Sequence, residues 1–451
     1  MTDTLAPAEI ATDVLDELRT WLDDNWDPDL TVAEWWERLG LAGWAAPTLP
    51  TNAYGKGVAR SVGVQIQREI LAAGALGPPS GLGLLLAAPT IADHGTQEQI
   101  DTMVRDIVTG QRSWCQLFSE PGAGSDLAGL TTKAVRDGDE WIVTGQKVWT
   151  SLGQTADLGM LIARTNPDAP KHQGITYFSI DMHQPGVSVR PLREMTGHAM
   201  FNETFLDEAR VAHADIIGDL NGGWAVANST LGHERAGLGA GGAGGAGAAT
   251  PGTVAGDLPK RAGDFVSEKK AAKAKAKKEE VASGESKPKK ANDLGSAALL
   301  TNMARGNGAV TDPTIRQGLA QLYIMGEVGR YNTERSKAMR TQGKDIPGIG
   351  NIAKLSMSHI VRLQRDLGLA IVGPAGMLHA YTPEDQAALN DATGNPFLVA
   401  VTSTALYAQA PPIYGGTDQI QRNIIGERVL GLPKEPGPGK ETPFSELPKN
   451  S

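Results

Sequence analysis

The spacing of hydrophobic positions changes twice along the 451-residue chain. Residues 8–112 carry apolar side chains at helical spacing and are predicted to be mostly helical. Residues 113–219 hold short β-branched and aromatic runs between Gly, Asn, Asp and Pro, which predicts a compact β domain. Helical spacing returns from Gly222 onward. The helices expected there span 224–234, 314–341, 351–372 and 396–408, and the expected strands include 141–144, 159–163 and 175–180.

A helical block, a β block and a second helical block therefore stand in series. Alternating βαβ units, which would build a parallel nucleotide-binding sheet, do not occur in the pattern. At the start of the helix expected at 100–108, Thr96 is the predicted N-cap.

Two low-complexity segments interrupt the last helical region. Residues 236–256 are mostly Gly and Ala, so a loose tether or a frayed helix end is expected. Residues 268–290 are rich in Lys and are expected to be a solvated linker that buries no core. The predicted domains are 1–112, 113–219 and 220–433, with an insert at about 236–295 and a flexible tail at 434–451.

The composition is that of an ordinary soluble globular protein, with 40% hydrophobic and 21% charged residues. The only cysteine is Cys115, so no internal disulfide can form. The acidic N-terminus does not resemble a secretory signal, and the apolar stretch at 82–89 is too short to cross a bilayer. We therefore expect a cytoplasmic protein with no membrane partner. The net charge of −9 argues against nucleic acid as its partner.

Three segments hold residues suited to chemistry, and no metal site is predicted. Residues 119–129 read SEPGAGSDLAG, in which glycines allow close backbone approach while hydroxyls and free N–H groups suit an anionic or carbonyl ligand. Taken alone, this segment is equally compatible with a glycine turn. Residues 144–151 read TGQKVWTS and place an indole beside two hydroxyls, which suits one side of a planar cofactor or a core tryptophan. Residues 413–428 begin with a glycine turn that enters a helix, where Thr, Asp and Gln could cap the helix or bind a cofactor.

In this order and in an α–β–α layout, the three segments resemble the acyl-CoA dehydrogenase family. The resemblance covers nearly the whole chain outside 236–295 and the tail, and its most specific parts are SEPGAGSD and IYGGTDQIQ. It implies a mainly α fold with a central β domain, in which an N-terminal helical domain, a middle β-barrel domain and a C-terminal four-helix bundle follow one another. It also implies non-covalent FAD, an acyl-CoA substrate and an electron-transfer flavoprotein as electron acceptor. The expected assembly is a homodimer or tetramer, with a hetero-tetramer as the alternative.

The resemblance also assigns roles to individual residues. Ser119 and Ser151 match hydroxyls that bond the flavin ring, and Trp149 matches the indole that flanks it. The residues implied to bind the cofactor are Gln116, Phe118, Ser119, Gly124, Ser125, Trp149, Ser151, Thr417 and Gln419. Those implied to bind the substrate are Ser125, Arg235 and Gly416.

The catalytic base is the informative departure from the family. Many members carry a glutamate at the position of Gly415, and glycine cannot accept a proton. A branch of the family, with isovaleryl- and long-chain-type members, places the base on an earlier helix in a Glu-Arg pair, which matches Glu234-Arg235. The sequence therefore predicts that Glu234 abstracts the α-proton, while the backbone N–H of Gly415 remains a donor to the thioester oxygen. A carboxylate buried beside an apolar acyl chain has a raised pKa and is the better base for it.

Two departures leave other functions open. The family's Arg-x-Phe-Gly motif, which reaches the FAD of a neighbouring subunit, is missing, and Arg305 is at best its remnant. Pro374 removes a backbone donor from a turn that usually reads Gly-Gly-x-Gly. The alternatives are a non-catalytic or partner-dependent subunit of a heteromeric enzyme, a flavin monooxygenase, and a nucleic-acid-binding member of the same fold. Small residues after Glu234 suggest a wide acyl pocket for branched or ring-bearing chains.

Overall fold

The structure is a computed structural model that describes most of the chain and divides it into two compact units. The described residues are 7–238, 249–266, 296–340, 342–434, 436–437 and 441–448. The first unit comprises Met1–Leu192, Met200–Lys287 and Pro438–Ser451, and the second comprises Arg193–Ala199 and Pro288–Gly437. The domain boundaries read from the sequence stay a prediction.

The first unit begins with helices built around tryptophans. Trp35 and Trp36, on α2, are almost fully buried, and their indole N–H groups donate to the carbonyls of Leu76 (2.7 Å) and Gly77 (2.8 Å). The predicted Thr96 cap is confirmed, because Thr96 and Gln99 form a reciprocal capping box. The α-helices are α1 (Pro7–Asn25), α2 (Val32–Leu41), α3 (Arg60–Ala72), α4 (Ala88–His94), α5 (Gln97–Gln99) and α6 (Arg105–Val108), and the π-helical segments are η2 (Gly83–Ala87) and η3 (Ile100–Val104).

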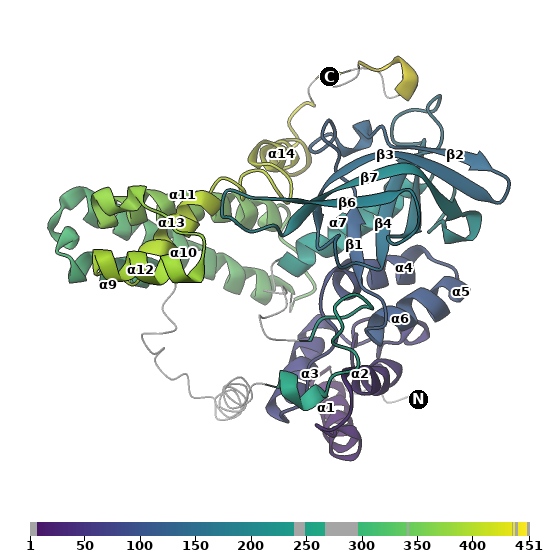
Figure 1. Ribbon diagram of the computed structural model, residues 1–451, viewed down its shortest axis with the longest axis horizontal. Helices are drawn as coiled ribbons and strands as arrows, with labels where there is room; N and C mark the ends of the chain where they lie inside the picture. The colour runs from purple at the N-terminus through teal and green to yellow at the C-terminus, as the bar shows by residue number, and fades with distance from the viewer. Residues whose placement is uncertain are drawn as a thin grey trace. The chain divides into compact units, whose positions relative to one another are not determined.

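A curled seven-stranded sheet follows in the same unit (Figure 1). The strands are β1 (Trp114–Leu117), β2 (Lys133–Asp137), β3 (Glu140–Ser151), β4 (Leu158–Arg164), β5 (Ile175–Asp181), β6 (Val187–Leu192) and β7 (Phe201–Ala212). They lie in the order β1-β4-β2-β3-β7-β6, with β5 also paired to β4. Pairing is antiparallel except where β4 runs parallel to β1 and β2.

Strand β1 joins the sheet to the helices because its side chains alternate between two cores. Trp114 and, just past the strand end, Phe118 pack into the core shared with the N-terminal helices. Cys115 and Leu117 point to the other face, into the core of the sheet. The strand therefore ends with its last residues fixed from both sides.

Helix α7 (Gly223–Leu238) also belongs to the first unit. A Cβ on Gly223 would lie 2.5 Å from the backbone of Thr176 and Tyr177, so only glycine allows the first turn to approach β5 this closely. Along the helix, Val226, Ala227 and Thr230 form a buried stripe at helical spacing.

The segment 249–266, inside the predicted insert, is docked on the first unit. Thr253 donates through its N–H (3.2 Å) and its hydroxyl to the buried carboxylate of Asp157. Further along, the carbonyls of Leu258 and Lys260 accept from the first turn of α2 (3.0 and 2.8 Å). The expectation of a loose tether is therefore wrong for 249–256, because long-range partners supply the hydrogen bonds. The Gly/Ala run at 239–248 and the Lys-rich run lie outside the described residues.

The second unit is a bundle of helices. Its core is formed by Leu300, Leu319, Leu367 and Ile371 from three of them. The helices are α9 (Ser296–Gly306), α10 (Pro313–Arg340), α11 (Ile349–Val372), α12 (Pro383–Thr393), α13 (Leu398–Tyr407) and the short α14 (Asp418–Ile424). The predicted fold class, mainly helical with a central β domain, is confirmed.

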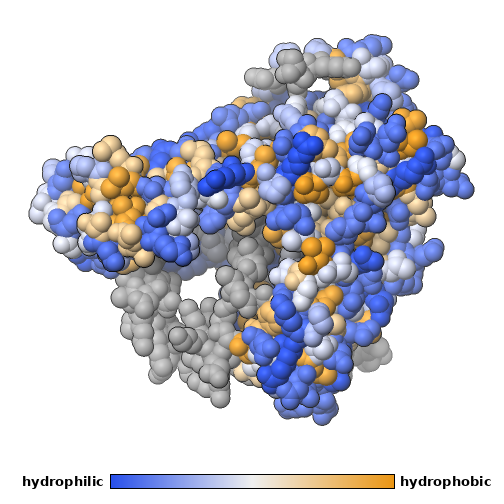
Figure 2. Space-filling view, viewed as in Figure 1, coloured by the Kyte–Doolittle hydropathy of each residue, from blue (hydrophilic) through white to orange (hydrophobic). Residues whose placement is uncertain are grey.

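Helix α10 carries some apolar residues on its solvent side as well as on its buried side. Tyr323, Ile324, Val328 and Tyr331 are each more than half exposed and follow one another at helical spacing. Apolar residues also interrupt the hydrophilic surface of this unit in the space-filling view (Figure 2). Within the described ranges, the helices are too short or too polar to span a membrane.

Candidate functional site

Trp149 stands out in the first unit through its backbone as much as its side chain. It lies in an irregularity of the β3–β7 register between Lys147 and Thr150 and has a φ of 63°, which non-glycine residues rarely adopt. The residue is 61% exposed, and its ring meets the ring of Phe201 edge-to-face, with the ring centres 5.9 Å apart. A strained residue that presents a large apolar ring to solvent indicates a binding function.

A buried ion pair ties this bulge to the SEPGAGSD segment. Lys147 is fully buried, and its Nζ donates to Glu120 Oε1 (2.9 Å) and to the Phe118 carbonyl (3.1 Å). The Val148 N–H also donates to the Ser119 carbonyl (2.9 Å). These contacts bring together the two segments that the sequence predicts as a flavin site, SEPGAGSD after β1 and TGQKVWTS at the end of β3.

Glu120 is ionised in this arrangement. Burial raises its pKa, but the charge of Lys147 and hydrogen bonds from Thr131 and Thr132 outweigh burial and bring the pKa to about 2. Burial in turn lowers the pKa of Lys147, and Glu120 opposes that effect. Because Glu120 is fully engaged, we assign it to holding the backbone rather than to chemistry.

The other predicted cofactor residues lie around these two segments. Ser119 and Ser151 are half-buried, while Gly124 and Ser125 are exposed in the turn after β1. Phe118 is buried against Tyr177. The structure therefore gathers the strand-end candidates, Ser119 and Trp149, in one unit.

These residues fit a planar ring cofactor such as the expected FAD. Gln116 Nε2 is buried and has no hydrogen-bond partner within the described part of the chain. A buried amide without a partner is costly unless a ligand or water satisfies it. The unsatisfied amide of Gln116 and the exposed ring of Trp149 are a polar and an apolar group, both in the first unit, of the kinds that such a cofactor would engage.

Glu234 continues the buried stripe of α7. It lies four residues after Thr230, on the same helix face as Val226 and Ala227, and it is half-buried. A carboxylate on a stripe that faces the core is unusual and is a candidate functional group. The side chain of Arg235 and the small residues that follow lie outside the described side chains.

In the second unit, the glycine turn adopts conformations that favour glycine. Gly415 and Gly416 have φ values of 62° and 78°. Thr417 then caps α14 by accepting from the Ile420 N–H (3.1 Å), and Gln419 is exposed in the first turn. The side chain of Gln419 is therefore exposed to solvent, while the Thr417 hydroxyl is already used as the N-cap of α14.

Asp418 is held by cations rather than free to act as a base. It accepts from Lys354 Nζ (3.0 Å) and Arg362 Nη2 (3.2 Å). Burial raises its pKa, but the bonds from Lys354 and Ser358 and both positive charges lower it overall. Asp418 is therefore a poor replacement for a base missing at Gly415. In the same unit, Arg305 is exposed near the end of α9.

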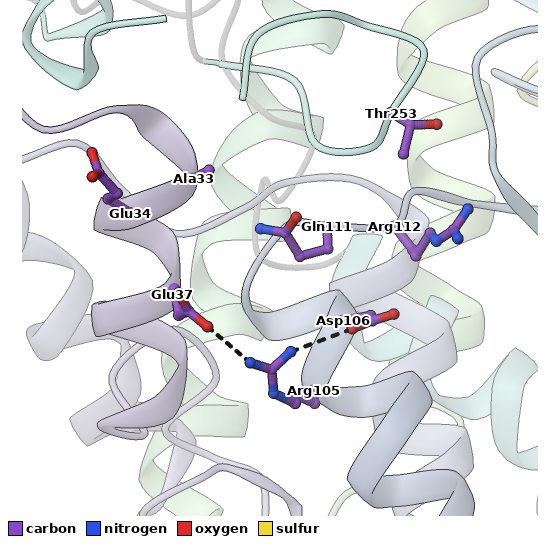
Figure 3. A pocket seen from close by; sticks show the side chains of 8 residues that line it. All are labelled: Ala33, Glu34, Glu37, Arg105, Asp106, Gln111, Arg112 and Thr253. Carbon is purple, nitrogen blue, oxygen red and sulfur yellow. Dashed lines mark hydrogen bonds and ion pairs between the residues drawn. The ribbon is translucent and has the colours of Figure 1, made fainter. Parts of the chain in front are cut away.

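A pocket of about 570 Å³ opens elsewhere in the first unit (Figure 3). Its lining is mostly charged, and Arg105 pairs there with Glu37 (2.8 Å) and Asp106 (3.7 Å). None of the predicted site residues lines it. Because its charges are largely paired with one another, we assign no chemistry to this pocket.

The sequence pattern did not identify the Glu120–Lys147 pair or the contacts of Tyr177. A lysine at an inward-facing position of β3 was the available signal, since such a residue requires a buried partner. The partner itself could not be read from spacing, because it lies 27 residues away.

Three family sequence models match the chain. They describe the N-terminal, middle and C-terminal domains of acyl-CoA dehydrogenases and match residues 8–111, 115–208 and 296–430. The acyl-CoA dehydrogenase IpdE1 of Mycobacterium tuberculosis is 32% identical over 404 residues, which cover 89% of this chain and 88% of that protein. The acyl-CoA dehydrogenase FadE34 of the same organism is 50% identical over 203 residues, but these cover 45% of this chain and only 28% of FadE34.

Solved structures share the fold along nearly the whole chain. A structure described as the Tcur3481-Tcur3483 steroid ACAD has a TM-score of 0.63 and 25% identity, covering 96% of this chain and all of that one. The ChsE4-ChsE5 complex of Mycobacterium tuberculosis has a TM-score of 0.59 and 25% identity, with the same coverage.

Proposed function

This chain belongs to the acyl-CoA dehydrogenase family, and from that premise we propose that it catalyses FAD-dependent α,β-dehydrogenation of an acyl-CoA to the trans-2-enoyl-CoA, with Glu234 as the base. The observation that carries the proposal is the place of the half-buried Glu234 on the face of α7 that continues from the buried stripe. Gly415, where many members carry the base, offers no carboxylate, and neighbouring Asp418 is neutralised by Lys354 and Arg362.

The chain's own residues account for the proton transfer. The α C–H of a thioester is weakly acidic, so its removal needs a positioned carboxylate and donors for the developing enolate oxygen. Glu234 accepts the α-proton, and the backbone N–H of Gly415 is the proposed donor to the oxygen. FAD, when bound, supplies the acceptor for the hydride that leaves the β-carbon.

Cofactor binding is assigned to the residues that surround the β3 bulge. Trp149 would supply the apolar contact to a bound flavin ring, and Gln116, Ser119 and Ser151 would supply the polar contacts. The family resemblance also assigns cofactor contacts to Gln419 and Thr417, which lie in the second unit. The ion pair below the bulge keeps Trp149 in its strained conformation.

The proposed substrates are bulky or ring-bearing acyl-CoA thioesters. The steroid ACAD named above supports this substrate class, and so does a cyclohexane-1-carbonyl-CoA dehydrogenase of Syntrophus aciditrophicus that is 34% identical over 135 residues, 30% of this chain and 35% of that one. Equal or faster turnover of straight-chain thioesters would contradict it.

The test is an anaerobic titration of the flavin-loaded protein with a panel of acyl-CoA thioesters. Wild type is expected to bleach the flavin, and Glu234→Gln is expected to lower the bleaching rate at least about 100-fold, as for loss of a general base. Ser229→Ala, a neighbour on α7, is the matched control and should bleach at the wild-type rate. Bleaching by Glu234→Gln at the wild-type rate would remove Glu234 from the mechanism.

A partner-dependent subunit is the second candidate. The exposed apolar stripe of α10 and Pro374 in the turn Gly373–Met377 support it, as does the likeness to the ChsE4-ChsE5 complex. The isolated chain would then fail to retain FAD until a second acyl-CoA dehydrogenase subunit is added. Retention of one FAD per chain in a homo-oligomer would exclude this candidate.

An electron-transfer flavoprotein is the proposed electron acceptor and would be supplied in turnover assays.

A further inference from the structure

Three hydroxyls meet in the interior of the first unit, between α4, β5 and α7. Thr90 Oγ1 lies 3.0 Å from Thr230 Oγ1, and the Tyr177 hydroxyl lies 3.3 Å from the same atom. Thr90 and Thr230 are fully buried, and Tyr177 is 1% exposed. We call these three residues the hydroxyl cluster.

The directions of these two hydrogen bonds follow from a third contact, which Thr230 makes within α7. Thr230 donates to the carbonyl of Val226, one turn back in α7 (3.1 Å). Its hydroxyl has a single proton, so Thr90 and Tyr177 must both donate to it. Burial raises the pKa of Tyr177, which keeps the phenol protonated and able to donate. Each hydroxyl in the cluster therefore has a partner, and the bonds join three separate elements.

Tyr177 connects the two parts of the proposed site. Its ring meets Phe118 edge-on, with centres 5.9 Å apart and planes at 89°, and Phe118 precedes Ser119. Its hydroxyl meets Thr230, which lies one turn before Glu234 on the same face of α7. One side chain thus spans from the strand end that carries the flavin candidates to the helix that carries the base.

We propose that the hydroxyl cluster is a positioning element that fixes the rotation of α7 about its axis and so directs Glu234 at the reacting carbon. This inference rests on the proposed role of Glu234. A carboxylate stands about 6 Å from a helix axis, so a rotation of about 20° moves it about 2 Å. A displacement of about 1 Å in a catalytic group can cost about 100-fold in rate. Packing of apolar side chains tolerates such a rotation more readily than the two directed hydrogen bonds from Thr90 and Tyr177 to Thr230 do.

Two other hydrogen bonds join α4 and α7, and one of them provides a matched control. Ser229 Oγ lies 2.7 Å from His94 Nε2, and His233 Nε2 lies 3.0 Å from Asp93 Oδ2. Ser229 is one residue from Thr230, so it lies about 100° around the helix from the stripe that leads to Glu234. Ser229→Ala therefore removes a bond between the same two helices without touching the cluster.

The experiment compares Tyr177→Phe, Thr230→Val and Thr230→Ser with Ser229→Ala in the full chain loaded with FAD. Tyr177→Phe and Thr230→Val are expected to lower the rate of anaerobic flavin bleaching at saturating acyl-CoA at least about tenfold, leaving the half-saturating concentration within about twofold. The isotope effect from deuterium at the α-carbon should rise in both. Thr230→Ser, which keeps the hydroxyl, and Ser229→Ala should match wild type.

A readout without substrate or cofactor comes from hydrogen exchange of the α7 amides. Faster exchange over 226–234 in Thr230→Val and Tyr177→Phe, but not in Ser229→Ala, supports the proposal. If Thr230→Val does not fold, Tyr177→Phe, which keeps the ring and its contact with Phe118, gives the answer alone. Bleaching rates and isotope effects in Tyr177→Phe equal to those of Ser229→Ala would overturn it. A wild-type rate in Glu234→Gln would instead refute the proposed function itself.

Discussion

Replacing Glu120 with glutamine tests the buried ion pair that ties the bulge of β3 to the segment after β1. In the folded protein the pKa of Glu120 is about 2, against about 4.3 in an unfolded chain. This difference corresponds to about 3 kcal/mol of folding free energy at neutral pH. The substitution also leaves the buried Lys147 ammonium without a counter-charge, so the total loss is expected to be about 3–5 kcal/mol.

The pH dependence has a definite sign. Because folding lowers the pKa of Glu120, its contribution is complete above about pH 4.3 and is lost as the pH falls toward 2. About half of it should be gone at pH 3. The part of the difference in unfolding free energy between wild type and Glu120→Gln that comes from the Glu120 charge should thus be constant from pH 8 to 5 and shrink below that range. The unpaired Lys147, whose pKa burial lowers, adds a cost that grows as the pH falls.

Urea denaturation followed by tryptophan fluorescence and circular dichroism at a series of pH values measures this difference. Glu140→Gln is the control, because Glu140 pairs with Arg210 at 2.7 Å on the surface, and we expect no measurable change there. Wild-type stability of Glu120→Gln at pH 7 would refute the reasoning.

Three further predictions concern Trp149, Thr253 and Thr417. Trp149→Gly relieves the positive φ and should leave the cofactor-free protein as stable or up to about 1 kcal/mol more stable. Flavin fluorescence should report FAD affinity at least about tenfold weaker in this variant, and Trp149→Phe, which keeps a ring, should have an affinity between those of wild type and Trp149→Gly. Unchanged affinity in Trp149→Gly would exclude a role of the indole in binding the flavin. Thr253→Val removes the side-chain bond to Asp157 and should speed limited proteolysis within 249–266 without altering the melting temperature, and equal cleavage rates would show that the backbone bonds suffice. Thr417→Ala removes the N-cap of α14 and should cost about 1 kcal/mol in chemical denaturation, whereas Thr417→Ser should not; equal losses in both would mean that the methyl group, not the cap, matters.

Local chemistry determined much of what could be predicted from the sequence alone. The period of apolar positions identified α10, α11 and β3 to β5, because side-chain spacing and element type are linked by backbone geometry. The Thr96 cap followed from residue type and spacing for the same reason. Residue identity also raised the question of the base, since Gly415 has no side chain to accept a proton and Glu234 offers one.

Only the tertiary structure decided which polar groups are engaged. Glu120 and Lys147 are far apart in sequence, and whether each is buried with the other depends on the pairing of β3 with its neighbours. The sequence alone allows Asp418 to act as a base, but in the structure Lys354 and Arg362 on α11 form ion pairs with it. The Gly/Ala-rich composition of 236–256 predicted a tether, yet Thr253 in this stretch is bonded to Asp157, and the residues that follow are bonded to the first turn of α2. Hydrogen bonds and ion pairs between distant segments depend on where the fold brings them, and spacing along the chain carries no information about that.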